Sequence, residues 1–351
     1  MQKVRAPAAV RTTSECTRAF MERRDPDRAE ESPQWDRVLA SMPQNGTTFG
    51  GAPMPQVSRA PDEADWLLEL AAACPFGFGD RLGTANYLDG SARRRAVAAS
   101  ASGEVVSLAR PLANGPTVRA DGRPAMSVEL FRTAMGGTTV GSDHVELDCH
   151  GAFQTHLDAL NHVGLGGTWY GNRPIDDPDP PSVADLARAG LVGRAVFADI
   201  PAWRGTPWVE PGYPVSGDDI DSALQRAGVT FESGDALLLY MGRDRYEAAG
   251  HAYPPRTRQS NPGLGEDGAR WVAAHRTSIL CWDFLDAAFG QPGHSNAHSL
   301  VWAIGQLLVD NCDFGLLKAS VAESGVVGAL VLAPLALPGA TGCVVNPVVL
   351  R

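Results

Sequence analysis

Apolar and polar positions recur with two different periods from about residue 62 onward. Helical spacing of the apolar positions predicts helices over 62–73, 91–101, 182–189, 216–227, 267–275 and 297–308. Alternating or short apolar runs predict strands over 105–108, 126–132, 142–150, 195–200, 236–241, 278–282 and 326–335. This interleaving of strands and helices is typical of an α/β fold built on a mixed sheet or a barrel.

Residues 1–60 follow neither period. They mix proline, glycine, serine and charged residues without a sustained apolar face, so we expect a poorly ordered N-terminal leader over 1–60 and an ordered body over 61–351. A chain of 351 residues is long enough for two domains, although one large domain with an extension fits equally well.

Composition and charge narrow the range of partners. The longest apolar run, 326–337, is interrupted by Gly328 and Pro334 and falls short of the ~20 residues that cross a bilayer. Lys and Arg number 30 against 40 Asp and Glu, and the resulting net charge of −10 disfavours nucleic acid. The 6 cysteines form no CxxC pair, and no apolar signal segment opens the chain, so we expect a cytoplasmic protein.

Segment 150–162, HGAFQTHLDALNH, carries the densest chemical signal. It contains His150, His156, Asp158 and His162. If 156–158 is extended, the i, i+2 spacing turns His156 and Asp158 to the same side, where an imidazole and a carboxylate can hold one divalent cation. Zn²⁺ is the ion we expect first, with Mn²⁺ as the alternative. Hydrogen-bonded loop histidines are the other interpretation, which this clustering disfavours.

Further ligands must come from elsewhere in the chain. His294, His298 and Asp310 are the best candidates, with His298 placed on the predicted helix 297–308. Asp310 follows an apolar run, which is unusual for a solvated charge and indicates a ligand or a buried hydrogen bond. The alternative is that Asp310 caps the following turn together with Asn311.

Aromatic side chains near the segment suggest the kind of substrate. Phe153 lies within it, and Tyr170 and Asn172 follow shortly after, so we expect these three to contact a planar aromatic or cyclic small molecule. Ordinary packing is the alternative for each. Arg243 is interpreted as a surface charge, and contact with a substrate carboxylate is its alternative.

Segment 155–162, THLDALNH, resembles the metal-binding motif of the cyclase family, the metal-dependent hydrolases that include bacterial kynurenine formamidase and isatin hydrolase. His298 and Asp310 resemble the downstream histidine and acidic ligand of that family in order and spacing. The resemblance extends from about residue 65 to the C-terminus, and it includes segments 83–87, 106–112, 234–239, 262–264 and 269–271.

The resemblance implies a role for each matching residue. His156 and Asp158 would be metal ligands, His298 and Asp310 would complete a second or shared position with Asp158 bridging, and His162 would be the catalytic histidine. It also implies that the body is a single swivelling β/β/α barrel-like catalytic domain, with a mixed sheet and peripheral helices. One domain over 61–351 agrees with a site that draws on both His156 and His298.

Two positions depart from the family pattern. Better-known members place their first histidine four residues before the second, where this chain has Ala152; His150 lies six residues before His156. Either a bulge lets His150 take over as a ligand, or the site has lost one ligand. Asp310 stands where many members have glutamate, which shortens the reach of the carboxylate by one methylene.

A metal site of this composition suits hydrolysis. A bound divalent ion with an open position lowers the pKa of water from 15.7 toward ~7, and a neighbouring histidine can move the proton. We therefore expect hydrolysis of a carbon–nitrogen bond in an amide, formamide or cyclic amide. The alternatives are a metal-assisted cyclase or dehydratase of secondary metabolism, and a non-catalytic binding protein that retains the fold. We expect a homo-oligomer acting on a small molecule, without nucleic-acid or membrane partners.

Overall fold

The computed structural model describes residues 65–77, 79–112, 126–253, 261–287, 297–321 and 324–351. The expected leader and His294 lie outside these ranges. The chain divides into two compact units, one comprising 1–56 and 114–147 and the other 57–113 and 148–351. The expected division at residue 60 stays a prediction.

The described part of the smaller unit is a β-hairpin. Strand β2 (Met126–Met135) pairs antiparallel with β3 (Thr138–Leu147), with Val128 opposite Val145. The turn consists of Gly136 and Gly137, which both have positive φ angles, of 54° and 86°. Strand 142–150 was expected to reach His150, but β3 ends at Leu147, so His150 lies on a loop rather than on a strand.

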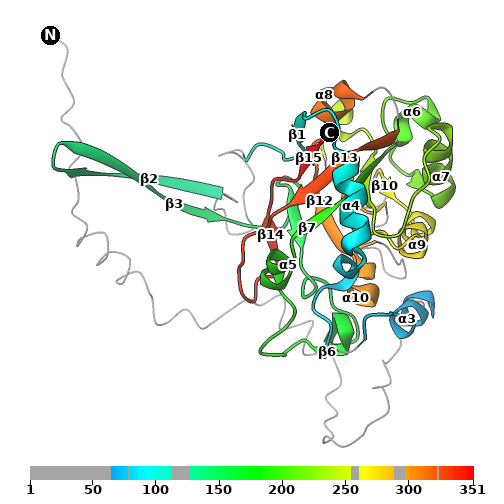
Figure 1. The fold of residues 1–351 in the computed structure, drawn as a ribbon, viewed down its shortest axis with the longest axis horizontal. Helices are drawn as coiled ribbons and strands as arrows, with labels where there is room; N and C mark the ends of the chain where they lie inside the picture. The colour runs from blue at the N-terminus through cyan, green and yellow to red at the C-terminus, as the bar shows by residue number, and fades with distance from the viewer. Residues whose placement is uncertain (1–64, 78, 113–125, 254–260, 288–296, 322–323) are drawn as a thin grey trace, which may run out of the picture. The chain divides into compact units, whose positions relative to one another are not determined.

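The larger unit is built on a nine-stranded mixed sheet with helices around it (Figure 1). The strand order is β1-β15-β13-β7-β9-β11-β12-β4-β14. The central strands β7, β9, β11 and β12 are parallel, and the pairings outside them are antiparallel. The strands are β1 (Val105–Ser107), β4 (His156–Asp158), β7 (Leu191–Asp199), β9 (Ala236–Tyr240), β11 (Ile279–Trp282), β12 (Leu307–Asp310), β13 (Gly325–Leu332), β14 (Gly342–Val344) and β15 (Val348–Leu350).

Short elements connect these strands. The helices are α3 (Asp65–Ala72), α4 (Gly90–Ala98), α5 (Val183–Ala189), α6 (Ile200–Arg204), α7 (Gly217–Arg226), α8 (Arg243–Ala248), α9 (Glu266–Ala274), α10 (Ser299–Ile304) and α11 (Gly315–Ser320), with 3₁₀ turns η1 (Gly83–Tyr87) and η2 (Tyr170–Asn172). Two small ladders pair β5 (Thr168–Trp169) with β6 (Arg173–Pro174) and β8 (Pro214–Val215) with β10 (Gly263–Leu264). Each helix in the described ranges is too short or too polar to cross a membrane.

Alternation along the central strands creates two apolar cores. On β9, Leu237 and Leu239 face the core that helices α3, α7, α9 and α10 cover, whereas Ala236 and Leu238 face the opposite core. Leu157 of β4 contributes to this second core. Because side chains of a strand alternate between faces, strands buried on both sides read as continuous apolar runs, and these runs were recognisable in the sequence.

Helix boundaries follow from local capping. At α7, the Asp219 N–H donates to the Ser216 hydroxyl (3.2 Å) and the Ser216 N–H donates to the Asp219 carboxylate (3.1 Å), which is a capping box. The helix expected over 297–308 ends early, at Ile304, because Gly305 adopts a left-handed φ of 66°. Residues from Leu307 onward then enter β12.

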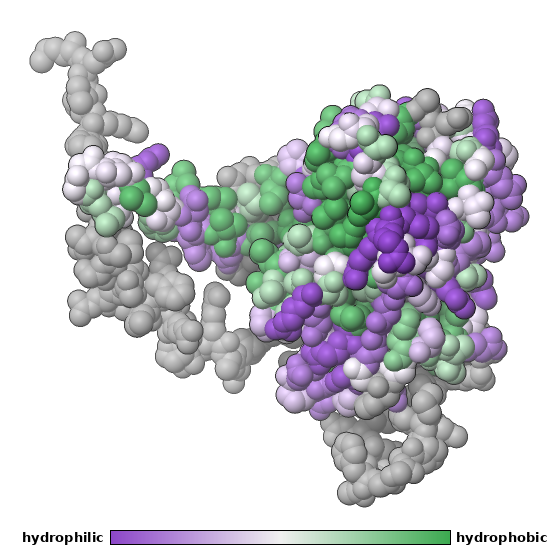
Figure 2. All heavy atoms as spheres, viewed as in Figure 1, coloured by the Kyte–Doolittle hydropathy of each residue, from purple (hydrophilic) through white to green (hydrophobic). Residues whose placement is uncertain are grey.

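Apolar side chains gather on one face of the larger unit over β1, β13 and β15 (Figure 2). Val105, Val326 and Leu350 are exposed there. Exposed apolar patches of this kind are typical of contact surfaces. The expected homo-oligomer stays a prediction.

Candidate metal centre

The sheet brings the two halves of the site together. Strand β4 pairs antiparallel with β12, and His156 lies directly opposite Asp310 at the carboxyl end of β12. Residues 156–158 are extended, so His156 and Asp158 project to the same side. Residues more than 150 positions apart in the sequence thus meet through one strand pair.

Asp158 is the centre of the cluster. Its side chain is fully buried, and its carboxylate lies 3.1 Å from His150 Nδ1, 3.5 Å from His156 Nε2, 3.8 Å from His162 Nε2 and 3.9 Å from His298 Nε2. Neither Asp158 oxygen has a hydrogen-bond partner among the described residues. Burial alone would raise the pKa of Asp158, but the surrounding imidazoles lower it below its ordinary value.

Asp310 presents one carboxylate oxygen to the cluster. Its Oδ1 accepts a hydrogen bond from the indole nitrogen of the fully buried Trp282 (2.6 Å). Its Oδ2 lies 3.2 Å from His298 Nε2 and 3.8 Å from His156 Nε2. The side chains form two sets of potential ligand atoms, and the atoms of each set lie within 4.8 Å of one another. One set comes from His150, Asp158 and His162, and the other comes from His156, Asp158 and Asp310. Asp158 belongs to both sets.

Contacts outside the cluster orient two of the imidazoles. His156 Nδ1 donates to the carbonyl oxygen of Gln154 (2.9 Å), and because a carbonyl can only accept, Nε2 keeps its lone pair for the cluster. His298 Nδ1 lies 2.5 Å from the buried carboxylate of Asp286, which turns its Nε2 inward. Burial alone would lower the pKa of His298, but Asp310 and Asp286 raise it well above 6.5.

His150 reaches the cluster from the loop before β4. Its ring stacks on His162, with centroids 3.9 Å apart and planes 8° from parallel. Its Nε2 lies 2.9 Å from the Thr341 hydroxyl, which leaves Nδ1 toward Asp158. The ring also needs the glycine at position 342, because a Cβ there would lie 2.6 Å from His150 Cε1. The loop thus brings His150, rather than residue 152, against Asp158.

His162 is partly exposed, at 27% of its side chain. Burial lowers its pKa to about 4, although Asp158 acts in the opposite direction. The imidazole is therefore neutral at neutral pH and able to accept a proton.

Comparison with known proteins identifies the family. The Cyclase family model matches residues 100–288, more than half of the 351 residues. The chain belongs to the cyclase family. The matched range includes the 150–162 segment and ends before His298 and Asp310. No protein of curated function matches the chain.

Solved structures show the cyclase-family fold. A crystal structure of a novel cyclase has a TM-score of 0.64 at 20% identity and covers 78% of this chain and 95% of that one. Isatin hydrolase A from Labrenzia aggregata, bound to benzyl benzoate, has a TM-score of 0.53 at 18% identity, and the match covers 73% of this chain and 97% of that one. Isatin hydrolase A from Ralstonia solanacearum has a TM-score of 0.51 at 16% identity, and the match covers 70% of this chain and 90% of that one. The expected barrel-like α/β architecture with a mixed sheet is confirmed.

Tyr170, Asn172 and Phe153 of this cyclase-family chain are the residues expected to contact substrate. Tyr170 is 1% exposed, and its hydroxyl donates to Asp80 (2.9 Å). Tyr170 begins the 3₁₀ turn η2, and Asn172 ends it with a left-handed φ of 58°. Phe153 is exposed on the loop that carries His150. Their contact with substrate stays a prediction.

Two side chains of the site had no signal in the sequence. Trp282 ends an apolar strand of ordinary pattern, and Asp286 lies shortly after that strand. Only the pairing of β11 with β12 brings Trp282 to Asp310. Arg243 was expected at the surface but is fully buried, because carbonyl groups and Glu247 surround its guanidinium.

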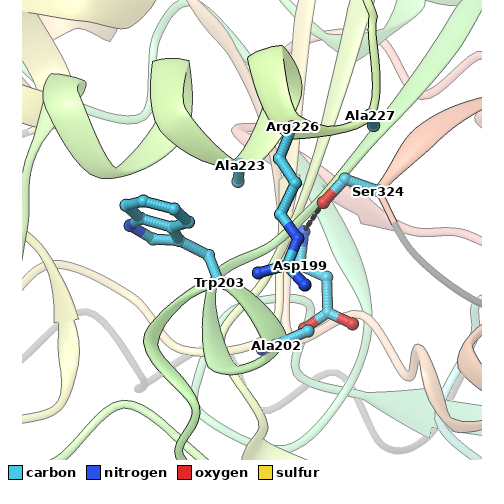
Figure 3. A pocket seen from close by; sticks show the side chains of 7 residues that line it. All are labelled: Asp199, Ala202, Trp203, Ala223, Arg226, Ala227 and Ser324. Atoms are coloured by element: carbon cyan, nitrogen blue, oxygen red, sulfur yellow. Dashed lines mark hydrogen bonds between the residues drawn. The ribbon is translucent and has the colours of Figure 1, made fainter.

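A cavity of about 140 Å³ lies apart from the histidines, between α6 and α7 (Figure 3). None of the clustered histidines and aspartates lines it. Its lining residues are Asp199, Ala202, Trp203, Ala223, Arg226, Ala227 and Ser324.

The residues of the cluster fit a divalent metal ion. Asp158 is a buried carboxylate whose oxygens lack hydrogen bonds, and a buried charge is costly unless an opposite charge or a metal ion lies beside it. Imidazole nitrogens and carboxylate oxygens are the ligand types that Zn²⁺ and Mn²⁺ accept. Trp282, Asp286 and the Gln154 carbonyl supply the outer contacts that hold such ligands in orientation.

Proposed function

We propose that the cluster holds a divalent metal ion and that the protein hydrolyses a carbon–nitrogen bond in an amide, formamide or cyclic amide. The observation that carries this proposal is Asp158, a buried carboxylate without hydrogen bonds that four imidazoles surround. Similar structures that bear the name isatin hydrolase support the same class of reaction.

Five residues would hold the metal: His150, His156, Asp158, His298 and Asp310. Asp158 belongs to both sets of ligand atoms, so it is the residue that would bridge two ions if two bind. Asp310 would contribute one oxygen, because the Trp282 indole occupies the other. Zn²⁺ suits this combination of imidazole and carboxylate ligands, with Mn²⁺ as the alternative.

The bound ion would supply a water of lowered pKa and polarise the carbonyl under attack. His162 is the residue that would move the proton. Its imidazole is neutral at neutral pH and its Nε2 lies 3.8 Å from Asp158, at the edge of the cluster. It would accept the proton of the attacking water and donate it to the departing nitrogen. His150, stacked against it, restricts the orientation of its ring.

The position of His150 bears on the alternative of a binding protein with an impaired site. That alternative rests on Ala152, which leaves the usual ligand position empty. His150 Nδ1 lies 3.1 Å from Asp158, so the loop offers a substitute imidazole. This placement favours a complete ligand set. The expected aromatic or cyclic substrate is part of the proposal, with the exposed ring of Phe153 as its candidate contact.

The test combines metal analysis with a substrate panel. The purified protein is assayed with N-formyl aromatic amines, isatin-like lactams and aliphatic amides, and product mass is measured. We expect a product heavier than the substrate by one water, or two products whose summed mass is one water greater. Loss of water from the substrate would instead indicate a dehydratase or cyclase. Stoichiometric metal without turnover of any carbon–nitrogen substrate would contradict the proposed reaction.

A further inference from the structure

Three adjacent parallel strands end beside the loop that carries His150. In sheet order these strands are β9, β11 and β12, and β4 lies next to β12. Arg243 follows β9, Asp283 follows β11, and Asn311 follows β12. Residues 151–154 lie one residue before β4, which begins at His156. The sheet order therefore lines up these residues at one edge of the metal cluster.

Arg243 spans this edge. Its side chain is fully buried, and its Nη1 donates to the Asp283 carbonyl (3.2 Å) and to Asn311 Oδ1 (2.7 Å). Its Nη2 donates to the Ala152 carbonyl (2.6 Å), and its Nε donates to Glu247 (2.9 Å). A guanidinium is always protonated and presents its donors in a rigid planar fork. Arg243 therefore fixes the Ala152 carbonyl relative to the ends of β11 and β12.

Asn311 holds the same loop from the end of β12. Its Nδ2 donates to the Gly151 carbonyl (2.7 Å) and to the Gln154 carbonyl (3.1 Å). The residue adopts a left-handed φ of 56°, a conformation that asparagine tolerates better than most residues. Its side-chain oxygen accepts from Arg243, so the two side chains form one connected unit.

The loop passes this constraint to His150. Gln154 Nε2 donates to the His150 carbonyl (3.0 Å) and to the Asp148 carbonyl. The carbonyls of His150, Gly151, Ala152 and Gln154 are thus all held by side-chain donors. Gly151 has a φ of 132°, which lets the backbone turn between His150 and Ala152.

We propose that Arg243 and Asn311 are positioning residues that hold loop 151–154 so that His150 occupies the ligand position that Ala152 leaves empty. The inference rests on the proposed function, because it assigns His150 to the metal. Without these donors the Gln154 carbonyl would lose a buried hydrogen bond, and the partly buried carbonyls of Gly151 and Ala152 would turn toward water, so the loop would relax to a different shape. The His150 imidazole would then move away from Asp158.

The test compares four chains by their binding of Co²⁺: wild type, Asn311→Asp, His150→Ala and the double variant. Asn311→Asp keeps the size of the side chain and its acceptor but removes both N–H donors. Co²⁺ affinity is measured by competition with a chromophoric chelator, and the visible absorption spectrum of bound Co²⁺ reports the ligand set. The matched control is Gln306→Glu, which makes the same amide-to-carboxyl change at a fully buried residue just before β12, at the opposite end of that strand.

We expect Asn311→Asp to weaken Co²⁺ binding by about 10–100-fold, as is usual when an outer contact of a metal ligand is lost. Its Co²⁺ spectrum should match that of His150→Ala, and the double variant should bind no more weakly than His150→Ala alone. Gln306→Glu should retain the wild-type spectrum. Losses that multiply in the double variant, or a wild-type spectrum in Asn311→Asp, would overturn the proposal.

Arg243→Lys provides a second variant should Asn311→Asp fail to fold. It keeps the positive charge but loses the fork that reaches Ala152 and Asn311 together. We expect the same change of spectrum as in His150→Ala, and an unchanged spectrum would overturn the proposal. If His150→Ala itself leaves affinity and spectrum unchanged, the positioning proposal fails while metal-dependent hydrolysis still stands. If wild type binds no divalent ion, the proposed function fails as well.

Discussion

The imidazole of His150 lies parallel to that of His162, with ring centroids 3.9 Å apart. The two residues flank β4 in the sequence, and both rings lie beside the carboxylate of Asp158, 3.1 Å from His150 Nδ1 and 3.8 Å from His162 Nε2. Their contact joins a proposed ligand to the proposed proton carrier. A change in either ring therefore affects the other, and the roles can be separated by measuring metal content and turnover in the same variant.

Replacement of His162 by alanine should abolish most turnover and leave the bound metal nearly unchanged. The imidazole moves the proton in our account, and such a group contributes typically ~10²–10⁴-fold to the rate. The variant is assayed for product formation and for metal content by elemental analysis. Loss of the metal together with activity would instead identify His162 as a ligand, as its place in one of the two sets of ligand atoms allows.

Trp282→Phe tests the hydrogen bond that holds Asp310. Phenylalanine keeps an aromatic ring in the core but removes the indole donor 2.6 Å from Oδ1. Because hydrogen bonds to charged groups contribute about 1.5–3 kcal/mol, we expect a free energy of unfolding lower by that order and weaker metal binding. Denaturant titration and chelator competition measure the two effects. A weakened fold with unchanged metal affinity would show that Asp310 is not a ligand.

Metal uptake should release a proton from His298 at neutral pH. Burial alone would lower the pKa of His298, but Asp310 and Asp286 raise it well above 6.5, so the metal-free imidazole is protonated at pH 7. An imidazole must lose its proton before its Nε2 can bind a metal, so affinity should rise with pH until the raised pKa of His298 is passed, and it should fall as pH falls.

Asp286→Asn removes one of the two charges that raise this pKa. Fewer protons should then be released per metal at pH 7, which calorimetry in two buffers of different ionisation enthalpy can count. Equal proton release in wild type and Asp286→Asn would contradict the role given to the contact between His298 and Asp286.

Removal of the metal with a chelator should lower the melting temperature. An ion that binds the folded chain stabilises it by RT ln(1 + [L]/Kd), about 2.7 kcal/mol at 100 times Kd. In the metal-free protein, the carboxylate of Asp158 also stays buried without hydrogen bonds. Asp158→Asn should melt at the same temperature with and without chelator. A chelator-sensitive melting temperature in that variant would point to a metal elsewhere in the chain.

The sequence predicted the features that local pattern encodes. The i, i+2 spacing of His156 and Asp158 places both on one side of β4, and Ser216 is the N-cap of α7, as the sequence indicates. The predicted helix 297–308 was too long because apolar residues on both sides of Gly305 share one period, whereas a left-handed glycine ends the helix.

Contacts set by strand pairing had no local signal. Trp282 contacts Asp310 only because β11 and β12 are neighbouring strands. Asp286 contacts His298 across 12 positions of the sequence, a separation that neither helix nor strand periodicity predicts. The position of His150 depends on donors from Arg243 and Asn311, which follow two other strands. The sequence therefore left two alternatives open. Either His150 takes the ligand position that Ala152 cannot fill, or the site has lost one ligand.

The central claim is that Asp158 and the imidazoles around it bind a divalent metal ion. Elemental analysis of the purified, extensively dialysed protein tests this most directly, with Asp158→Asn measured in parallel and its folding verified by circular dichroism. We predict at least one Zn²⁺ or Mn²⁺ per wild-type chain and none in the variant. A folded wild-type protein without stoichiometric metal, even after incubation with both ions, would contradict the account.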